Sequence, residues 1–195
     1  MLEEEGYRIV LDPYTGVAGY PPLQVSAHAA FCSHGHFDHY AVDCVALLPE
    51  EISPFAVREV ETFHDDRRGA LRGPNIIRIF TAGGVSVAHL GDLGHQLSAE
   101  QLRAIGPVDA ALVPVGGVYT LDAAGARAVC EVLKPKCVVP MHYHHAPYGL
   151  PELADGEEFL KLWPAGEVHR LSGSSFEIAG GESGVLVPKF NRNAT

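Results

Sequence analysis

One run of six residues, HGHFDH at positions 34–39, constrains this chain more than any other feature, because it holds four metal-type side chains. It directly follows an apolar segment that we expect to be a buried strand. In an extended backbone, side chains two positions apart point the same way, so His34 and His36 can face one point. Asp38 and His39 can then turn toward a second point a few ångströms away. Imidazole and carboxylate groups suit zinc, iron or manganese, so the run predicts a metal site rather than a histidine-rich surface loop.

The composition is that of a folded, acidic protein. The chain has 195 residues, which suits a single domain over 1–195, and 47% of them are hydrophobic against 19% charged. The formal net charge is −10, from 14 Lys and Arg against 24 Asp and Glu. This charge repels phosphate backbones, so it disfavours nucleic acid and favours a small-molecule substrate.

Two further features bear on compartment. No apolar run approaches the roughly 18–20 residues that span a membrane, and residues 1–6 lack the basic and apolar parts of a secretory signal. We therefore expect a cytoplasmic protein with no membrane partner. The cysteines form no CxxC pair, and we expect buried thiols at Cys32, Cys44, Cys130 and Cys137.

The expected strands fall into two groups, with helices between and after them. The clearest signal is a hairpin of 75–80 with 85–90 across Gly83-Gly84. A capping-box pattern opens a helix at Ser98, which ends at Gly106-Pro107. The other expected strands cover 7–11, 27–32, 110–115, 137–140, 168–171, 175–178 and 185–187, the other expected helices cover 122–133 and 157–162, and 42–48 is either helix or strand. This order favours two sheets with helices packed outside them, rather than a doubly wound sheet.

The HxHxDH pattern of residues 34–39 resembles the signature of the metallo-β-lactamase superfamily. Other motifs of that family follow in its order: Asp12 after the first expected strand, FHD at 63–65, GDLGH at 91–95 and PMHY at 140–143. The sequence around these motifs, including PVGGVYTLDA at 114–123, is most similar to a branch of metal-dependent hydrolases that includes ascorbate-6-phosphate lactonase-like proteins.

The resemblance implies an α/β (α+β) fold, a four-layer αββα sandwich. It also implies a binuclear centre of two divalent ions, with zinc favoured and manganese or iron as alternatives. The first ion would be held by His34, His36 and His64, the second by Asp38, His39 and His142, and Asp92 would bridge both. Asp12 would hold the metal loop. Only eleven residues precede Asp12, so the family's extra N-terminal strand is expected to be missing or shortened.

A bridged pair of ions can turn shared water into hydroxide, which would attack a small ester, lactone or phosphoester. Asp38 and Asp92 would act chiefly as ligands, and either could briefly take a proton. His36 stands where oxygen-reducing relatives carry Glu, which favours hydrolysis. The alternatives are a phosphodiesterase or nuclease, and a metal-binding module without turnover.

The roles of the remaining polar residues stay open at this stage. His89 is expected on the opposite face of its strand from Asp92, in a structural role, and His144 is the first alternative ligand. Asp65 either orients His64 or belongs to a solvated acidic turn.

Substrate contact is weighed for four side chains, each against a structural alternative. They are Tyr119, His95, Asn75 and Arg72, with an anionic substrate in view for the last two. The alternative for Tyr119 is outward packing in a helix-capping loop whose N-cap is Thr120.

Overall fold

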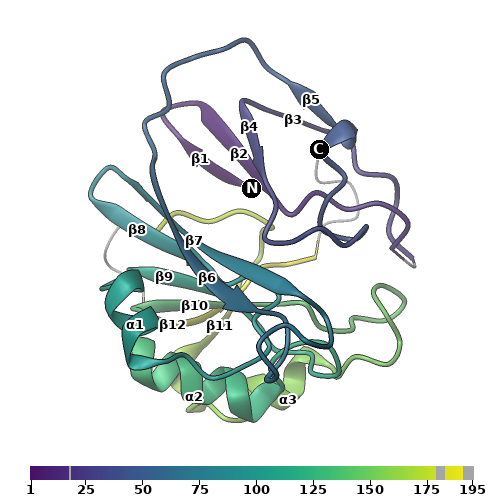
Figure 1. The fold of residues 1–195 in the computed structure, drawn as a ribbon, viewed down its shortest axis with the longest axis vertical. Helices are drawn as coiled ribbons and strands as arrows, with labels where there is room; N and C mark the ends of the chain where they lie inside the picture. The colour runs from purple at the N-terminus through teal and green to yellow at the C-terminus, as the bar shows by residue number, and fades with distance from the viewer. Residues whose placement is uncertain (18, 179–182, 191–195) are drawn as a thin grey trace.

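The computed structural model describes residues 1–17, 19–178 and 183–190. Two β-layers face each other, and the α-helices cover one outer side (Figure 1). A seven-stranded sheet forms the middle layer, and a three-stranded and a two-stranded sheet form the layer opposite the helices. None of the helices in the described ranges is long and apolar enough to cross a membrane.

The bounds of the elements follow the chain in order. The strands are β1 (Leu2–Glu4), β2 (Tyr7–Leu11), β3 (Val25–Ala27), β4 (Ala29–Phe31), β5 (Val45–Leu47), β6 (Ala56–Phe63), β7 (Pro74–Ala82), β8 (Val85–His89), β9 (Ala110–Pro114), β10 (Cys137–Met141), β11 (Val168–Arg170) and β12 (Gly184–Val187). The helices are α1 (Ala99–Ile105), α2 (Ala123–Leu133) and α3 (Gly156–Leu160), with 3₁₀ turns η1 (Val42–Cys44) and η2 (Ala165–Glu167).

Strand direction in the large sheet decides where the functional loops lie. The order is β11-β12-β10-β9-β8-β7-β6. Only β7 runs against its neighbours, since it pairs antiparallel with both β6 and β8, whereas β8, β9 and β10 pair parallel. The carboxyl ends of β6, β8, β9 and β10 therefore meet at one edge of the sheet, and the loops that follow them start side by side.

The large sheet has two apolar faces. Side chains such as Ile77, Ala111 and Val113 pack against the helices, together with Val129 of α2 and Phe159 of α3. On the other face, buried residues of β8–β10 and β12 pack against Leu2 and the segment that holds Phe176 and Ile178. Because both faces are covered, β9 and β10 are continuously apolar, as buried parallel strands are.

The small sheets place a second group of loops near the same edge. In the β1-β2-β4 sheet, β2 and β4 run parallel, so Asp12 after β2 lies beside the loop that leaves β4. That loop is tied to the large sheet, because the Ile76 amide donates to the Ser33 carbonyl at 2.9 Å. The metal-type run at 34–39 thereby faces the large sheet.

Most expected elements are confirmed, including the 75–80/85–90 hairpin and the capping box of Ser98 with Gln101 before α1. The expected strand at 27–32 is divided, because it forms β3 with 25–27 and β4 with 29–31, which belong to different sheets. The strand expected at 175–178 is wrong: this segment has no regular structure and is held by its apolar side chains. Two strands, β1 and β6, were not predicted from the sequence.

Three smaller differences concern the edges of the fold. The first strand, β1, has three residues, and the described part of the chain has no α-helix over the small sheets, so the fourth layer is reduced there. Asp122, two residues after Thr120, is the N-cap of α2. Cys44 is exposed, whereas Cys130 and Cys137 are buried as expected.

Candidate metal centre

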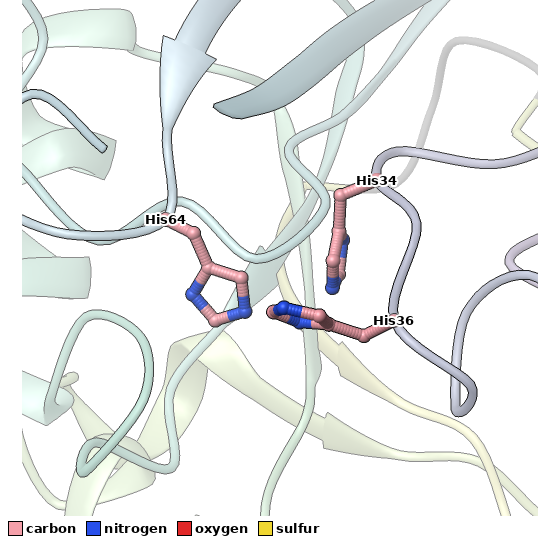
Figure 2. Close-up of side chains that lie close together, drawn as sticks. All are labelled: His34, His36 and His64. Carbon is pink, nitrogen blue, oxygen red and sulfur yellow. The ribbon is translucent and has the colours of Figure 1, made fainter. Parts of the chain in front are cut away.

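Side chains from four separate segments converge at the edge where the strand ends meet. Figure 2 shows His34 and His36 on one loop and His64 beyond the end of β6, with their ring nitrogens turned toward one another. Three groups each have ligand atoms within 4.8 Å of one another: His34, His36 and His64; His34, His39 and Asp92; and Asp38, His39 and His142. All seven residues expected as ligands are thus brought together.

Asp92 lies at the centre of this cluster and is only 2% exposed. Its Oδ2 atom is 3.0 Å from Nε2 of His64 and 3.3 Å from Nε2 of His142. The same oxygen is 3.4 Å from Nε2 of His39 and 3.9 Å from Nε2 of His34. One carboxylate oxygen therefore stands between imidazoles of the 34–39 loop and imidazoles from the large sheet.

A second buried carboxylate, Asp12, holds the 34–39 loop in place. It accepts the Ser33 amide at 2.6 Å and the Ser33 hydroxyl at 2.8 Å. It also lies 3.1 Å from Nδ1 of His39 and 2.8 Å from Nε2 of His89. Its backbone is in the left-handed region, at φ 46°. His89 thus has a structural contact, as expected for its face of the strand.

Hydrogen bonds on the outer side of the imidazoles determine which nitrogen faces the cluster. Since the Ser33 hydroxyl donates to Asp12, it accepts from Nδ1 of His34 at 2.9 Å. The Tyr119 carbonyl accepts from Nδ1 of His64 at 3.0 Å. With Nδ1 engaged in this way, Nε2 of each ring faces the cluster, where a metal would take the place of any proton that Nε2 carries.

Asn75 supports the loop that carries Asp92. Its side-chain carbonyl accepts the Asp92 amide at 2.9 Å, and its Nδ2 donates to the Leu90 carbonyl at 3.0 Å. Gly91 sits between them at φ 54°, and a Cβ there would overlap both Asn75 and Ser33. The close approach of β7, β8 and the 34–39 loop therefore requires glycine at this position.

Burial and charge shift the acid–base behaviour of these groups. Burial alone would raise the pKa of Asp92, but hydrogen bonds from His142 and His64 and the charge of His39 hold it well below its usual range. Burial would also raise the pKa of Asp12, and the neighbouring His89 and His39 keep it well below normal. Both acids are therefore carboxylates at neutral pH.

The histidines shift in opposite directions. Burial lowers the pKa of His34 to about 3, so this ring is neutral at pH 7. Burial would also lower the pKa of His39, but its hydrogen bond to Asp12 and the charge of Asp92 raise it to about 9. The pKa of His64 is raised by Asp92 against the effect of burial. The negative potential that favours protons here favours a divalent cation in the same place.

The donor set fits a divalent metal ion. Buried Nε2 of His34, Oδ1 of Asp92 and Nδ1 of His142 have no hydrogen-bond partner among the described residues. Leaving a buried polar atom unpaired costs about 1–3 kcal/mol, and Nε2 of His34 and Asp92 lie inside the cluster, where an ion would satisfy them. Imidazole and carboxylate donors suit zinc, manganese or iron.

Two residues considered for substrate contact have structural roles instead. Asn75 is 0% exposed and all its contacts are internal, so the substrate role is wrong for it. His95 uses both ring nitrogens on the backbone, since Nε2 accepts from the Phe63 amide at 3.2 Å and Nδ1 donates to the Gln96 carbonyl at 2.8 Å. It fixes the end of β6, from which His64 follows.

The structure also settles the place of Asp65, which neither orients His64 nor lies in a solvated turn. It is 3% exposed and accepts four backbone amides of its own loop at 2.8–3.0 Å: those of Arg67, Gly69, Leu71 and Arg72. These bonds lower its pKa to about 2 against the effect of burial. His144, the alternative ligand, belongs to none of the three ligand groups found in the described residues.

Arg72 and Tyr119 lie together beside the centre. Nη2 of Arg72 donates to the Val118 carbonyl at 3.0 Å, and its guanidinium lies over the Tyr119 ring, 5.4 Å from the centroid. The Tyr119 hydroxyl donates to Glu152 at 2.8 Å. Sequence analysis missed Glu152 and Ser33: no local pattern marks the first, while the second is recognisable only by its position directly before His34.

Comparison with known proteins agrees with this fold and centre. A family model described as Beta-lactamase superfamily domain matches residues 1–142. A crystal structure from Thermotoga maritima, described as a candidate Zn-dependent hydrolase of the metallo-beta-lactamase superfamily, superposes with a TM-score of 0.70 at 30% identity, over 95% of this chain and 92% of that one. An isothiocyanate hydrolase from Delia radicum gut bacteria gives 0.61 at 12% identity, over 96% and 92%, and shows the fold alone. The fold and site define a protein of the metallo-β-lactamase class.

The chain belongs to this beta-lactamase superfamily. It is 30% identical over 192 residues to a UPF0173 metal-dependent hydrolase from Thermococcus onnurineus, covering 80% of this chain and 84% of the relative. It is 28% identical over 187 residues to a protein of the same name from Carboxydothermus hydrogenoformans, covering 75% and 81%. The finer resemblance to ascorbate-6-phosphate lactonase-like proteins stays a prediction.

Proposed function

We propose that this metal-dependent hydrolase holds two divalent metal ions, with zinc favoured over manganese and iron, and cleaves a small ester, lactone or phosphoester. The observation that carries the proposal is the position of Oδ2 of Asp92 among four imidazole nitrogens, at 3.0–3.9 Å. A cytoplasmic location stays a prediction.

The grouping of ligand atoms supports two ions rather than one. His34, His36 and His64 form one group, whereas Asp38, His39 and His142 form another that shares no residue with it. Asp92 faces both, since its Oδ2 lies near His64 of the first group and His142 of the second. Each group would supply three ligands, and Asp92 would supply a fourth to both.

Each side chain has a distinct role in the chemistry. Two ions held this way supply an activated water and polarise the bond under attack when bound. Asp38 is partly exposed, with Oδ2 3.7 Å from Nε2 of His39, so it faces the open side of the centre. From there it can hold a proton briefly during turnover. Asp92 is buried and its pKa is low, which suits a permanent ligand.

The two alternatives are distinguished by the substrate turned over. A phosphodiesterase or nuclease would cleave diesters, and the net charge of −10 disfavours an extended nucleic acid. A metal-binding module would hold the ions without turnover, because a set of ligands does not by itself prove catalysis.

The experiment combines elemental analysis with a substrate panel. The protein is loaded with zinc, manganese or iron in turn, and assayed on chromogenic esters, lactones, phosphomonoesters and bis-para-nitrophenyl phosphate. About two ions per chain with turnover of esters, lactones or monoesters supports the proposal. Turnover of the diester alone supports the phosphodiesterase, and two ions without turnover supports the module.

A matched pair of variants tests the ligand assignment. His36→Ala removes an exposed member of the first group and is expected to lower metal content toward one ion per chain. His169→Ala changes an exposed histidine of β11 outside all three groups and is expected to leave metal content unchanged. Equal metal content in both variants would overturn the assignment.

A further inference from the structure

The loop that follows His64 carries three arginines and two aspartates beside the metal centre. Arg67, Arg68 and Arg72 lie within six residues of a chain whose 14 Lys and Arg face 24 acidic residues. The four amides accepted by Asp65 fold this loop into a fixed shape. The guanidinium of Arg72, next to the centre of an acidic protein, indicates attraction for a negatively charged group there.

Arg72 is held by the 118–119 segment rather than free in solvent. Its side chain is half-buried, its Nη2 is bonded to the Val118 carbonyl, and its guanidinium covers the Tyr119 ring. The Tyr119 carbonyl in turn accepts from Nδ1 of His64. Arg72 and Tyr119 are therefore positioned by the same contacts that position a candidate ligand.

The Tyr119 hydroxyl already donates to a carboxylate. Its partner is Oε1 of Glu152, at 2.8 Å, an exposed residue in the segment between β10 and α3. The bond to Glu152 raises the pKa of Tyr119, with a further contribution from Asp38 and an opposite one from Arg72. The hydroxyl thus lies within electrostatic reach of both a candidate ligand and the guanidinium.

We propose that Arg72 and the Tyr119 hydroxyl bind an anionic group of the substrate, a carboxylate or phosphate separate from the bond that is cleaved. Without substrate, Glu152 accepts the hydrogen bond of the Tyr119 hydroxyl. The anionic group of the substrate then replaces Glu152 as the acceptor. The proposal rests on the hydrolase function above and narrows its substrate class to organic anions. Binding the anion on the side of His64 orients the cleavable bond over the centre.

Two exposed apolar side chains favour the binding of an organic anion over that of an inorganic anion. Leu71 is 58% exposed and Val118 is 56% exposed, and they are the chain neighbours of Arg72 and Tyr119. Val118 is a β-branched residue at φ 59°, a backbone region that such residues rarely adopt. The Val118 carbonyl, which accepts the hydrogen bond from Arg72, thus belongs to a residue with an unfavourable backbone conformation. Such residues are typical of functional loops.

The test compares a neutral ester with a matched anionic one. The metal-loaded enzyme is assayed on para-nitrophenyl acetate and on mono-para-nitrophenyl succinate, and the ratio of their kcat/KM values is the readout. The wild type is expected to prefer the succinate. Arg72→Gln and Tyr119→Phe are each expected to lower this preference, the first by about tenfold or more, because a charged hydrogen bond is lost. Metal content is measured in every variant.

Two further variants separate specificity from structure. Glu152→Gln removes the competing charge and is expected to lower KM for the succinate. Arg103→Gln changes an exposed arginine in the last turn of α1 and is expected to leave the preference unchanged. Equal losses on both esters in Arg72→Gln, or a wild type without preference, would overturn the proposal.

Two further experiments identify the kind of anionic group that is bound and test its binding in the absence of hydrolysis. The para-nitrophenyl ester of phosphonoacetic acid replaces the succinate in a parallel assay, and the larger preference identifies phosphate or carboxylate. If neither ester is hydrolysed, the hydrolase function fails for esters. The proposed anion site is then tested by calorimetry, which measures the binding of succinate to the metal-loaded wild type and to Arg72→Gln. Equal binding to both proteins would overturn it.

Discussion

The two halves of the metal centre are built in different ways. One half is a single loop, in which four candidate ligands lie within residues 34–39. The other half takes His64, Asp92 and His142 from the ends of three strands that are far apart in the chain. The loop obtains its ligands from local spacing, whereas the sheet obtains them from strand order and direction.

The halves also differ in what holds them. The loop follows a three-residue strand, and one carboxylate, Asp12, contacts Ser33, His39 and His89, beside the backbone bond from Ile76 to Ser33. The sheet half stands on a seven-stranded core, and two of its ligands have separate supports, the Tyr119 carbonyl for His64 and Asn75 for Asp92. A single defect should therefore disturb the loop more than the sheet.

The largest effect is expected where the halves meet. Asp92→Ala removes a carboxylate that faces both groups, so metal content should fall at both positions and hydrolysis should drop below detection. Elemental analysis and the ester assay measure this, with His169→Ala as the control. Retention of two ions per chain would show that the halves hold their ions independently.

The next effect is expected at the support of the loop. Asp12→Ala unties Ser33, His39 and His89, and should weaken metal affinity about 10–100-fold, as loss of such outer partners does. Glu3→Gln, which changes an exposed carboxylate paired with Arg8, is the control. Competition with a chelator measures affinity, and a loss of less than twofold would mean that the loop holds its shape alone.

A smaller effect is expected at the support of the sheet half. Asn75→Ala leaves the Asp92 amide and Leu90 carbonyl unpaired, which should lower the free energy of unfolding by about 1–3 kcal/mol. Metal affinity should fall less than in Asp12→Ala, because the strands still fix Asp92. Urea unfolding and the same chelator competition measure both, with Gln96→Ala, an exposed amide, as control. An affinity loss larger than that of Asp12→Ala would reverse the comparison.

The smallest effect is expected on stability at acidic pH, in the loop that follows His64. The pKa of Asp65 is about 2 in the folded protein, below the usual 3.8, so its stabilisation is full above the usual value and lost as the pH falls toward 2. Asp65→Asn should therefore be less stable than wild type at pH 5, and the gap should narrow by pH 2. Urea unfolding across this range measures it, with the exposed neighbour Asp66→Asn as control. A gap independent of pH would contradict the assignment.

Sequence patterns predicted most of the large sheet because most of its strands are apolar and bounded by turns. The hairpin of β7 and β8 is marked by β-branched residues and Gly83-Gly84, and α1 by its capping box. These patterns missed β6, an edge strand whose side chains are mostly exposed. The segment at 175–178 has the apolar residues of a strand, yet it only packs by side chain.

The sequence by itself determined the chemistry of this protein: the HGHFDH spacing, the other histidine and aspartate motifs in their order, and the acidic balance are properties of the chain. Only the tertiary structure decided which polar residues are buried supports of the metal centre and which lie beside it, partly exposed to solvent. Asn75 and Arg72 stand three positions apart, yet one is buried under Asp92 and the other covers Tyr119. The physical reason is that ligand type and spacing are local, whereas burial and hydrogen-bond partners depend on strands brought together from distant parts of the chain.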